Sequence, residues 1–472
     1  MTDLKKLQEW DDKITEFVKH FGLHCYTQEF EIADHFEMIG YMAYSGMPSR
    51  YSHWSFGKSY EREKMMYDYG VGGLPYEMVI NTNPCLAYLM RDNTELLQIL
   101  TIAHVYGHND FFANNFTFQT GLDAKYTFEM FKSHSKRVKS YIEDPSIGID
   151  AVERILDSAH ALSFQRSTNL AIKKEAKEDQ LKRLRNRAQN DNEKIDFDKH
   201  PLEPEQNILE FIADNSPALS EWERDLIRIV DKEASYFIPQ METKIMNEGW
   251  ASYWHYKIVN ALGLDPSLHL EFLVRHNQVL RPTPGGLNPY HLGFIIWNDI
   301  EKRWNNDNTG MEYQTEKPKI DLSRVHENDT PGRKKIFQVR EADRDRSFLR
   351  RFLTKEIMQE LDLFQHEKRG KERVITKVSD EESWEDVKNN LVNSVGTGSI
   401  PRILIQDADF QGNRILYIKH EHDGRDLQLE YAEKTLQHLN TLWGKDVYLE
   451  TNLNSRPSVL RIEGHHLKID KI

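Results

Sequence analysis

The chain has only two cysteines, Cys25 and Cys85, among its 472 residues. One pair of thiols cannot form the disulfide framework of a small secreted protein, and so few cysteines are typical of a reducing compartment. No run approaches the roughly 18–20 apolar residues that a membrane-spanning helix needs. Residues 1–20 mix charged and apolar side chains and lack the apolar core of a secretory signal. We therefore predict a cytoplasmic protein without a membrane span.

Positive charge is also in short supply. The chain has 62 basic against 75 acidic residues, which gives a net charge of −13 and argues against general binding to nucleic acid. The sequence contains no GxxxxGK[ST], no GxGxxG after a strand, no CxxC and no GxSxG. The usual signals of phosphate loops, Rossmann sites, thiol redox sites and nucleophile elbows are therefore missing.

Three regions differ in their residue patterns. Residues 1–300 hold most of the tryptophan and tyrosine and read mainly as helix, whereas 301–335 are polar and aperiodic. Residues 336–472 alternate short extended runs with helical patterns. We predict an α+β protein with a large, mainly helical N-terminal domain, a polar linker and a small α+β domain. The predicted strands are Ile336–Arg340, Val374–Val378, Ile403–Asp407, Ile415–Ile418, Val447–Glu450 and Val459–Ile462.

A helix that begins at Asn93 or Thr94 is apolar on almost every side through Val105, so we expect it to be buried. Residues 45–57 combine aromatic and small side chains, which indicates an ordered surface loop. Further helices are predicted at 4–20, 123–142, 150–164, 218–236, 240–262 and 266–279.

His104 and His108 stand one turn apart on the apolar helix, so both imidazoles can reach one metal ion. In a chain with 20 histidines, chance alone gives roughly one pair with this spacing. The apolar surroundings strengthen the signal, because two buried imidazoles need hydrogen bonds or a metal. The alternative is a pair of ordinary core histidines.

Two other helices place a carboxylate and an imidazole seven residues apart, and thus on one face: Glu153 with His160, and Glu248 with His255. Each pair alone is as well explained by a solvated face or a core hydrogen bond. Taken together with the histidine helix they supply two imidazoles and a carboxylate, a ligand pattern of many catalytic zinc sites. The predicted Zn²⁺ ligands are His104, His108 and Glu248. Glu153, His160 and His255 would then support the ligands, move protons or bind a second metal.

Val105 is the weak point of this hypothesis. In HExxH proteases the residue after the first histidine is the general base, and valine cannot accept a proton. Another carboxylate must do this work, and the candidates are Glu77, Asp110 and Glu153. If none of them lies close, the site is structural or inactive.

Weaker candidates complete the set. Arg50, His53 and Lys58 could bind an anion, and His291 could be a further ligand, although a structural role is the more common outcome for each. The segment 173–199 is dense in charge of both signs. It reads as a solvated helix or loop, with a docking arm for a protein partner as the alternative.

The motifs PSRYSHWSFGKSYE, GLPYEMVINTNPCLAYLM, IAHVYGHNDFFANN, NEGWASYWHY and NPYHLGF follow one another through residues 1–300. Together with DRSFLRRFLT and LWGKDVYLET near the C-terminus, they resemble the SpoVR family, stage V sporulation protein R. The resemblance implies a role in forming the spore cortex, a peptidoglycan layer, without a settled biochemical activity. Acting from the mother-cell cytoplasm, such a protein could alter precursors or regulate the machinery, but could not trim finished cortex.

Three hypotheses follow. The first is a cytoplasmic zinc-dependent hydrolase that serves cortex formation. The second is a non-catalytic adaptor that docks an unknown partner through the C-terminal domain or through 173–199. The third is a di-iron or di-manganese site, which ranks last because its carboxylate and histidine ligands normally stand three rather than seven residues apart.

Overall fold

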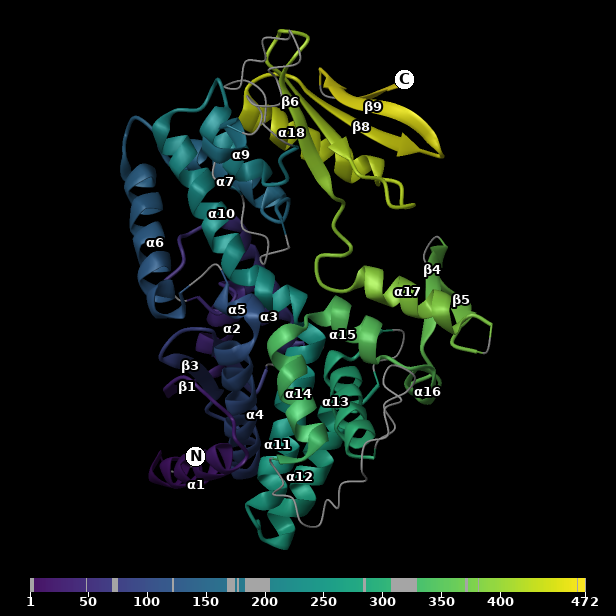
Figure 1. Cartoon of the computed structure of the whole chain (residues 1–472). Helices are drawn as coiled ribbons and strands as arrows, with labels where there is room; N and C mark the ends of the chain where they lie inside the picture. The colour runs from purple at the N-terminus through teal and green to yellow at the C-terminus, as the bar shows by residue number, and fades with distance from the viewer. Residues whose placement is uncertain are drawn as a thin grey trace. The chain divides into compact units, whose positions relative to one another are not determined.

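The computed structural model of the chain describes residues 4–47, 49–69, 75–120, 123–167, 175, 178–182, 204–282, 286–306, 329–369, 372–380, 382–464 and 466–471. Most of the charged segment 173–199 and the middle of the predicted linker therefore lie outside the described residues. The chain divides into two compact units, each built from separate stretches (Figure 1). The first comprises Met1–Arg50, Trp54–Met130 and Pro239–Gly396, and the second comprises Tyr51–His53, Phe131–Ile238 and Thr397–Ile472.

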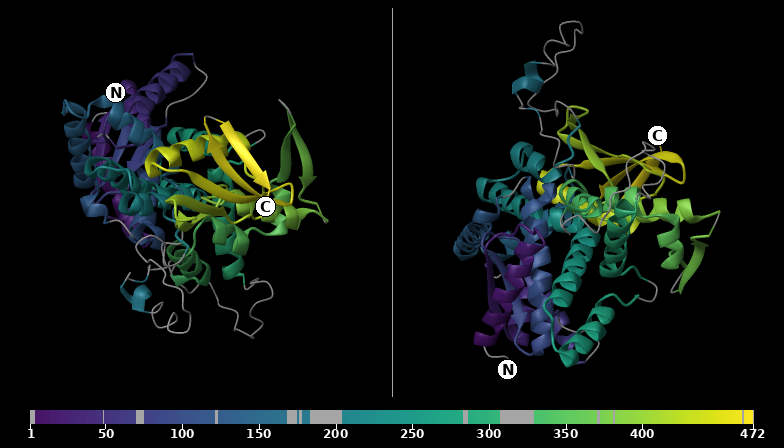
Figure 2. Two further views of the ribbon diagram at one scale, coloured as in Figure 1. Left: turned by 90° about the horizontal axis from the view of Figure 1, so that it is seen from above. Right: turned by 60° about the horizontal axis from the view of Figure 1, so that its bottom comes forward.

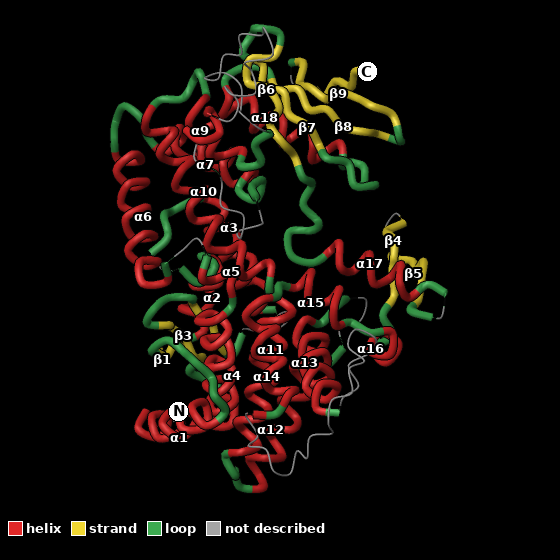
Figure 3. The backbone as a smooth tube through the Cα atoms, in the orientation of Figure 1, coloured by secondary structure: helices red, strands yellow, loops and turns green. Residues whose placement is uncertain are grey.

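The first unit is mainly helical (Figure 3). Its helices are α1 (Leu4–His20), α2 (His35–Ala43), α3 (Trp54–Asp68), α4 (Glu95–Asn114), α5 (Phe116–Gln119), the 3₁₀ turn η1 (Ala124–Tyr126), α11 (Lys244–Ala261), α12 (Pro266–Val279), α13 (Pro289–Asn305), α14 (Pro331–Ala342), α15 (Asp345–Phe352), α16 (Lys355–Glu360) and α17 (Trp384–Ser394). Its strands are β1 (Gln28–Ala33), β2 (Glu77–Ile80), β3 (Cys85–Met90), β4 (Phe364–Arg369) and β5 (Glu372–Val378).

Helix α4 runs through the core of this unit, as its composition predicts. Every residue from Leu96 to Phe112 is buried. The hydroxyl of Thr94 caps the first turn by accepting a hydrogen bond from the backbone N–H of Leu97. Helix α11 packs along α4 on one side and along α13 on the other, and its surface is likewise buried over most of its length. Two adjacent helices are therefore enclosed almost completely.

A small mixed sheet accompanies these helices. Strand β3 lies in the middle, with β1 parallel to it and β2 antiparallel. All six residues of β3 are buried, which is typical of a strand covered on both faces. Glu77 opens the edge strand β2 and pairs with Leu89. This pairing fixes the position of Glu77 at the start of β2.

One local prediction is wrong. Ile336–Arg340 is not a strand but part of helix α14, because Thr330 caps the helix and Pro331 occupies its first turn. The predicted loop 45–57 is a loop in its described residues through His53, and only its end is helical, since α3 begins at Trp54. Ile336, Val339 and Phe348 belong to the same hydrophobic core as α4 and α11. The chain passes between the two compact units several times, the last time between residues 396 and 397, and the predicted division at 301–335 stays a prediction.

The second unit combines helices with a five-stranded sheet (Figures 1 and 2). Its elements are most of α6 (Thr127–Glu143), α7 (Ile149–Leu162), α9 (Ile208–Asn215), most of α10 (Glu221–Glu242), β6 (Ile403–Phe410), β7 (Ile415–His420), α18 (Leu429–Trp443), β8 (Val447–Leu453), β9 (Arg456–Glu463) and β10 (His466–Lys471). The strand order is β10-β9-β8-β7-β6, and only β7 and β8 are parallel. Helix α18 makes the crossover between those two strands, as parallel pairing requires.

The fold is α+β, as predicted, with a large helical N-terminal region and a C-terminal sheet with its helix. Among the described helices, none has both the length and the apolar character needed to cross a membrane.

Candidate metal site

The site is built where α4 and α11 approach most closely. Gly107 lies between the two histidines of α4, and a Cβ atom there would stand 2.6 Å from the Cα atom of Ala251 on α11. Gly249 allows a similar close approach on the other side of α11, where a Cβ atom would lie 2.4 Å from the backbone of Gly293 on α13. Glycine costs about 1 kcal/mol in a helix, but here it brings three helix backbones together. Side chains on α4 and α11 can therefore meet directly.

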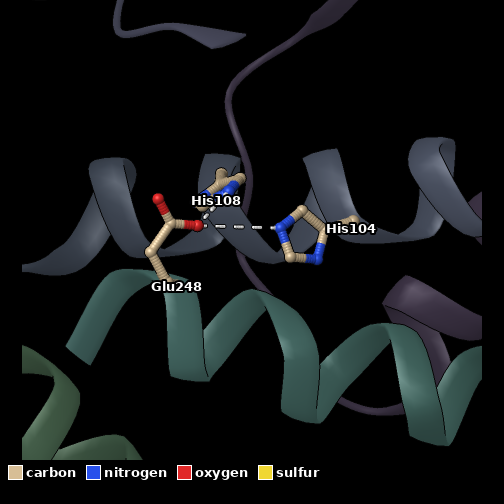
Figure 4. Close-up of side chains that lie close together, drawn as sticks. All are labelled: His104, His108 and Glu248. Carbon is tan, nitrogen blue, oxygen red and sulfur yellow. Dashed lines mark ion pairs between the residues drawn. The ribbon is translucent and has the colours of Figure 1, made fainter. Parts of the chain in front are cut away.

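His104, His108 and Glu248 converge between these helices (Figure 4). The Glu248 Oε2 atom lies 3.5 Å from His108 Nε2 and 3.9 Å from His104 Nε2. Zinc bonds of about 2.0–2.1 Å place tetrahedral ligands about 3.3–3.5 Å apart. The observed separations need little adjustment to match. Within the described residues, this is the one group of three histidine, cysteine or acidic side chains with ligand atoms that all lie within 4.8 Å.

Two of these ligand atoms have no hydrogen-bond partner. In the described part of the chain, His104 Nε2 and Glu248 Oε2 are both buried without a hydrogen bond, and their separation of 3.9 Å is too long for one between them. Burying a polar atom without a partner costs several kcal/mol, and both atoms face the same point. A cation between them would satisfy both atoms at once.

The remaining ring nitrogens of the site are hydrogen-bonded. His108 Nδ1 lies 2.9 Å from the Asn247 side-chain oxygen, and His104 Nδ1 lies 2.8 Å from His255 Nδ1. Support of this kind orients metal-binding histidines. The structure therefore places His255 beside His104, and its predicted role stays a prediction, whereas Asn247 did not emerge from the sequence.

Glu77 reaches the site from strand β2. Its Oε1 atom lies 4.0 Å from His104 Nε2, so a second carboxylate faces the same imidazole. Tyr290, at the start of α13, stacks on His104 with ring centroids 6.0 Å apart. Tyr290 did not emerge as a candidate from the sequence, although it precedes the predicted candidate His291 by one residue.

The two carboxylates differ in their pKa. Burial raises the pKa of Glu77, and the charge of Glu248 adds to this effect. Burial would also raise the pKa of Glu248, but the neighbouring His104 and His108 outweigh it and lower that pKa. Burial, followed by the charge of His104, lowers the pKa of His108 to about 4. At neutral pH the site thus contains an ionised Glu248 beside a neutral His108.

Asp110 has a different environment. Both of its oxygens bind Arg340 at 2.8 Å, and they also accept hydrogen bonds from Trp250 Nε1 and from the backbone N–H of His24. Asp110 stands two residues after His108, so it leaves α4 on another side. We therefore attribute a structural role to Asp110.

The second unit holds other predicted candidates. Glu153 and His160 lie on α7, and the Tyr51 hydroxyl lies 2.7 Å from His160 Nε2. His53 pairs with Asp157 at 3.2 Å. These groups belong to the second unit, whereas the ligand set belongs wholly to the first.

Arg50 and Lys58 belong to the first unit, whereas His53 belongs to the second. Arg50 stacks over the ring of Phe56 at 4.6 Å, and Lys58 lies 5.8 Å from the centre of the Trp54 ring. Such cation–π contacts are a common structural use of basic side chains. Anion binding by Arg50, His53 and Lys58 stays a prediction.

A carboxylate from another helix caps α11. The Thr243 side chain, at the N-cap position, makes no capping hydrogen bond. Instead, Asp345 of α15 accepts hydrogen bonds from the backbone N–H groups of Ile245 and Met246, both at 2.9 Å. Asp345 thereby fixes the first turn of α11, the turn that leads into Glu248.

Comparison with known proteins gives a consistent result. The family model described as "SpoVR like protein" matches residues 1–400, and the model described as "SpoVR-like C-terminal domain" matches residues 401–454. The border between them lies close to residues 396 and 397, where the chain passes for the last time between the compact units. The chain is also 32% identical over 480 residues to "Uncharacterized protein YcgB" of Escherichia coli (strain K12), which covers 93% of this chain and 90% of that protein. No solved structure matches.

Proposed function

The chain belongs to the SpoVR family, and from this premise we propose that it is a metal-dependent hydrolase that acts through His104, His108 and Glu248. The resemblance found in the sequence motifs is confirmed, and membership of the family indicates a sporulation-related protein. The finer assignment, to formation of the cortex peptidoglycan from the mother-cell side, is part of this proposal.

The observation that carries the proposal is that two buried atoms, His104 Nε2 and Glu248 Oε2, lie 3.9 Å apart without a hydrogen bond. A core built only for stability would give each of them a hydrogen bond or replace them by apolar groups. Two imidazoles and one carboxylate make up the protein ligands of several zinc hydrolases, which leave a further position for water. The donor set therefore fits Zn²⁺.

Bound zinc would supply a Lewis acid that activates a water and polarises a substrate carbonyl. The residues of this chain would do the rest. Glu248 would neutralise part of the charge of the ion, and Asn247 would hold the His108 ring with its Nε2 lone pair toward the ion. Both roles follow from atoms already in place.

Glu77 is the group we propose as general base. Its Oε1 atom lies 4.0 Å from His104 Nε2, and burial raises its pKa, which suits a group that must both take and return a proton. Glu77 would thus replace the glutamate that HExxH sites carry in the helix, where this chain has Val105. Among the described residues, Glu77 is the predicted carboxylate that lies 4.0 Å from a proposed ligand atom, His104 Nε2.

Metal analysis tests the proposal. Protein purified without chelator or affinity tag should contain about one zinc per chain, and His104→Ala/His108→Ala should contain none. Glu77→Gln should keep the zinc but fail to restore spore cortex in a spore-forming host that lacks its own SpoVR-family protein. Glu153→Gln is the matched control and should restore the cortex and keep the zinc.

Other results would point elsewhere. A stably folded wild-type protein without metal would favour the adaptor hypothesis, with a partner docked through the C-terminal region or the segment 173–199. Two irons or two manganese ions per chain would favour the dinuclear site. Equal cortex formation by Glu77→Gln and the wild type would contradict the role of Glu77 alone.

A further inference from the structure

Three buried histidines from three helices form a continuous hydrogen-bonded row. His104 Nδ1 on α4 lies 2.8 Å from His255 Nδ1 on α11, and His255 Nε2 lies 2.8 Å from His276 Nδ1 on α12. The three side chains belong to residues that are 3%, 0% and 4% exposed, so water does not compete for these bonds. The row begins at a proposed metal ligand and leads away from the metal position.

The protons of such a row are coupled. A hydrogen bond between two ring nitrogens needs an N–H on one and a lone pair on the other, and a neutral imidazole has one of each. If His104 carries its proton on Nδ1, His255 must accept at Nδ1 and carry its own proton on Nε2, and His276 must accept at Nδ1. If the order is reversed, His104 carries its proton on Nε2. Only these two arrangements of neutral rings satisfy both bonds.

Only the first arrangement leaves a lone pair on His104 Nε2, the atom that faces Glu248. We infer that His255 and His276 are positioning residues, which hold His104 in the tautomer and orientation that bind the metal. Histidine ligands are usually held in this way by a carboxylate or a carbonyl oxygen. Here a neutral imidazole accepts the proton of the ligand, and a second imidazole in turn fixes the first.

Packing keeps the far end of the row in place. The ring of His276 contacts Tyr256, Phe294 and Phe272, with centroid distances of 4.8, 5.2 and 5.7 Å. Rotation of His276 would require these rings to move. Since His276 cannot turn freely, its Nδ1 stays next to His255 Nε2, where it can accept the proton of His255 when the row has the first order.

The inference depends on the proposed metal site, and a pair of variants of similar shape tests it. His255→Asn keeps a side-chain oxygen near the Nδ1 position, which can still accept the proton of His104, whereas His255→Leu has no acceptor. We expect zinc affinity, measured by competition with a chromophoric chelator, to fall 10–100-fold in His255→Leu and clearly less in His255→Asn. The visible spectrum of bound Co²⁺ should shift more in the leucine variant.

The matched control is His420→Leu, which replaces a buried histidine of the second unit. This variant should leave zinc affinity unchanged. Circular dichroism checks that each variant is folded, and if His255→Leu does not fold, His276→Leu and His276→Asn repeat the test one ring further along. Equal losses in the asparagine and leucine variants would mean that the ring serves packing only and would overturn the inference. Unchanged affinity in both would overturn it as well. A wild-type protein that binds no zinc would instead overturn the proposed function.

Discussion

Helices α7 and α11 carry the same spacing of acidic residue and histidine, yet they differ in structure. In α7, Glu153 and His160 lie at the margin of an amphipathic helix and are only half-buried. In α11, Glu248 and His255 lie on a helix that is enclosed by neighbours over most of its length. His160 pairs with the Tyr51 hydroxyl, whereas Glu248, although only half-buried as a residue, has a buried Oε2 atom that lies beside two imidazoles. The apolar character of the surrounding helix was therefore a better guide to the candidate metal site than the seven-residue spacing.

The largest expected effect comes from forcing α4 and α11 apart. Gly107→Val places a branched side chain where a Cβ already lies 2.6 Å from the backbone of Ala251. We expect a loss of about 3 kcal/mol or more in the free energy of unfolding, measured by urea denaturation, together with loss of zinc.

Gly57→Ala on α3 is the control for this variant. A Cβ at Gly57 meets no atom within 4 Å, and alanine is the better helix former, so stability should rise by up to about 1 kcal/mol. A stable Gly107→Val protein with normal zinc content would show that the close approach of the helices is not required.

The next effect compares the two carboxylates directly. Glu248→Gln removes a charged ligand from the enclosed helix, and zinc affinity should fall more than about 100-fold, which corresponds to about 2.7 kcal/mol. Glu153→Gln makes the same chemical change on α7 and should leave the affinity unchanged. Zinc affinity is measured by chelator competition. An equal loss of affinity in the two variants would show that the carboxylate of α11 has no special role in zinc binding.

The last effect depends on pH and concerns the cap of α11, a device that α7 lacks, since Gly148 offers no capping side chain there. Burial raises the pKa of Asp345 to about 8, although its two backbone hydrogen bonds oppose this. The folded protein thus keeps a proton that the unfolded chain releases near pH 4, so this group contributes stability at low pH and loses it as the pH rises toward 8.

Asp345→Asn does not titrate. Measured against this variant, the free energy of unfolding of the wild type should therefore decline between pH 4 and 8, by at most about 1.4 kcal/mol per pH unit. Urea denaturation across that range checks the slope. Parallel pH profiles for the two proteins would show that Asp345 is ionised in the folded state throughout.

Much of the helical framework could be predicted from local patterns. The cap at Thr94 and the apolar surface of α4 both follow from short-range rules, and so did the expectation that His104 and His108 are buried. The segment 336–340 was misread because five mostly apolar residues fit a strand as well as a helix. The preceding Thr330 and Pro331, a helix start by the same rules, decided the outcome.

The surroundings of the site could not be predicted in the same way. Glu77 reaches His104 because β2 pairs with β3, and that pairing depends on contacts between distant segments. His276 gave no local signal either, since one histidine in the last turn of a helix is common. Its role depends on the path of α12 past α11. Sequence patterns indicate which groups are present, whereas tertiary packing decides which of them meet.

The first unit is interrupted in sequence, because the chain leaves it at Met130 and returns at Pro239. During translation, both imidazoles of α4 therefore emerge from the ribosome well before Glu248 is made. In the proposed zinc site, the third ligand would therefore be missing until residues 131–238 have been synthesised. The complete set of three ligands would form only after that segment has left the ribosome.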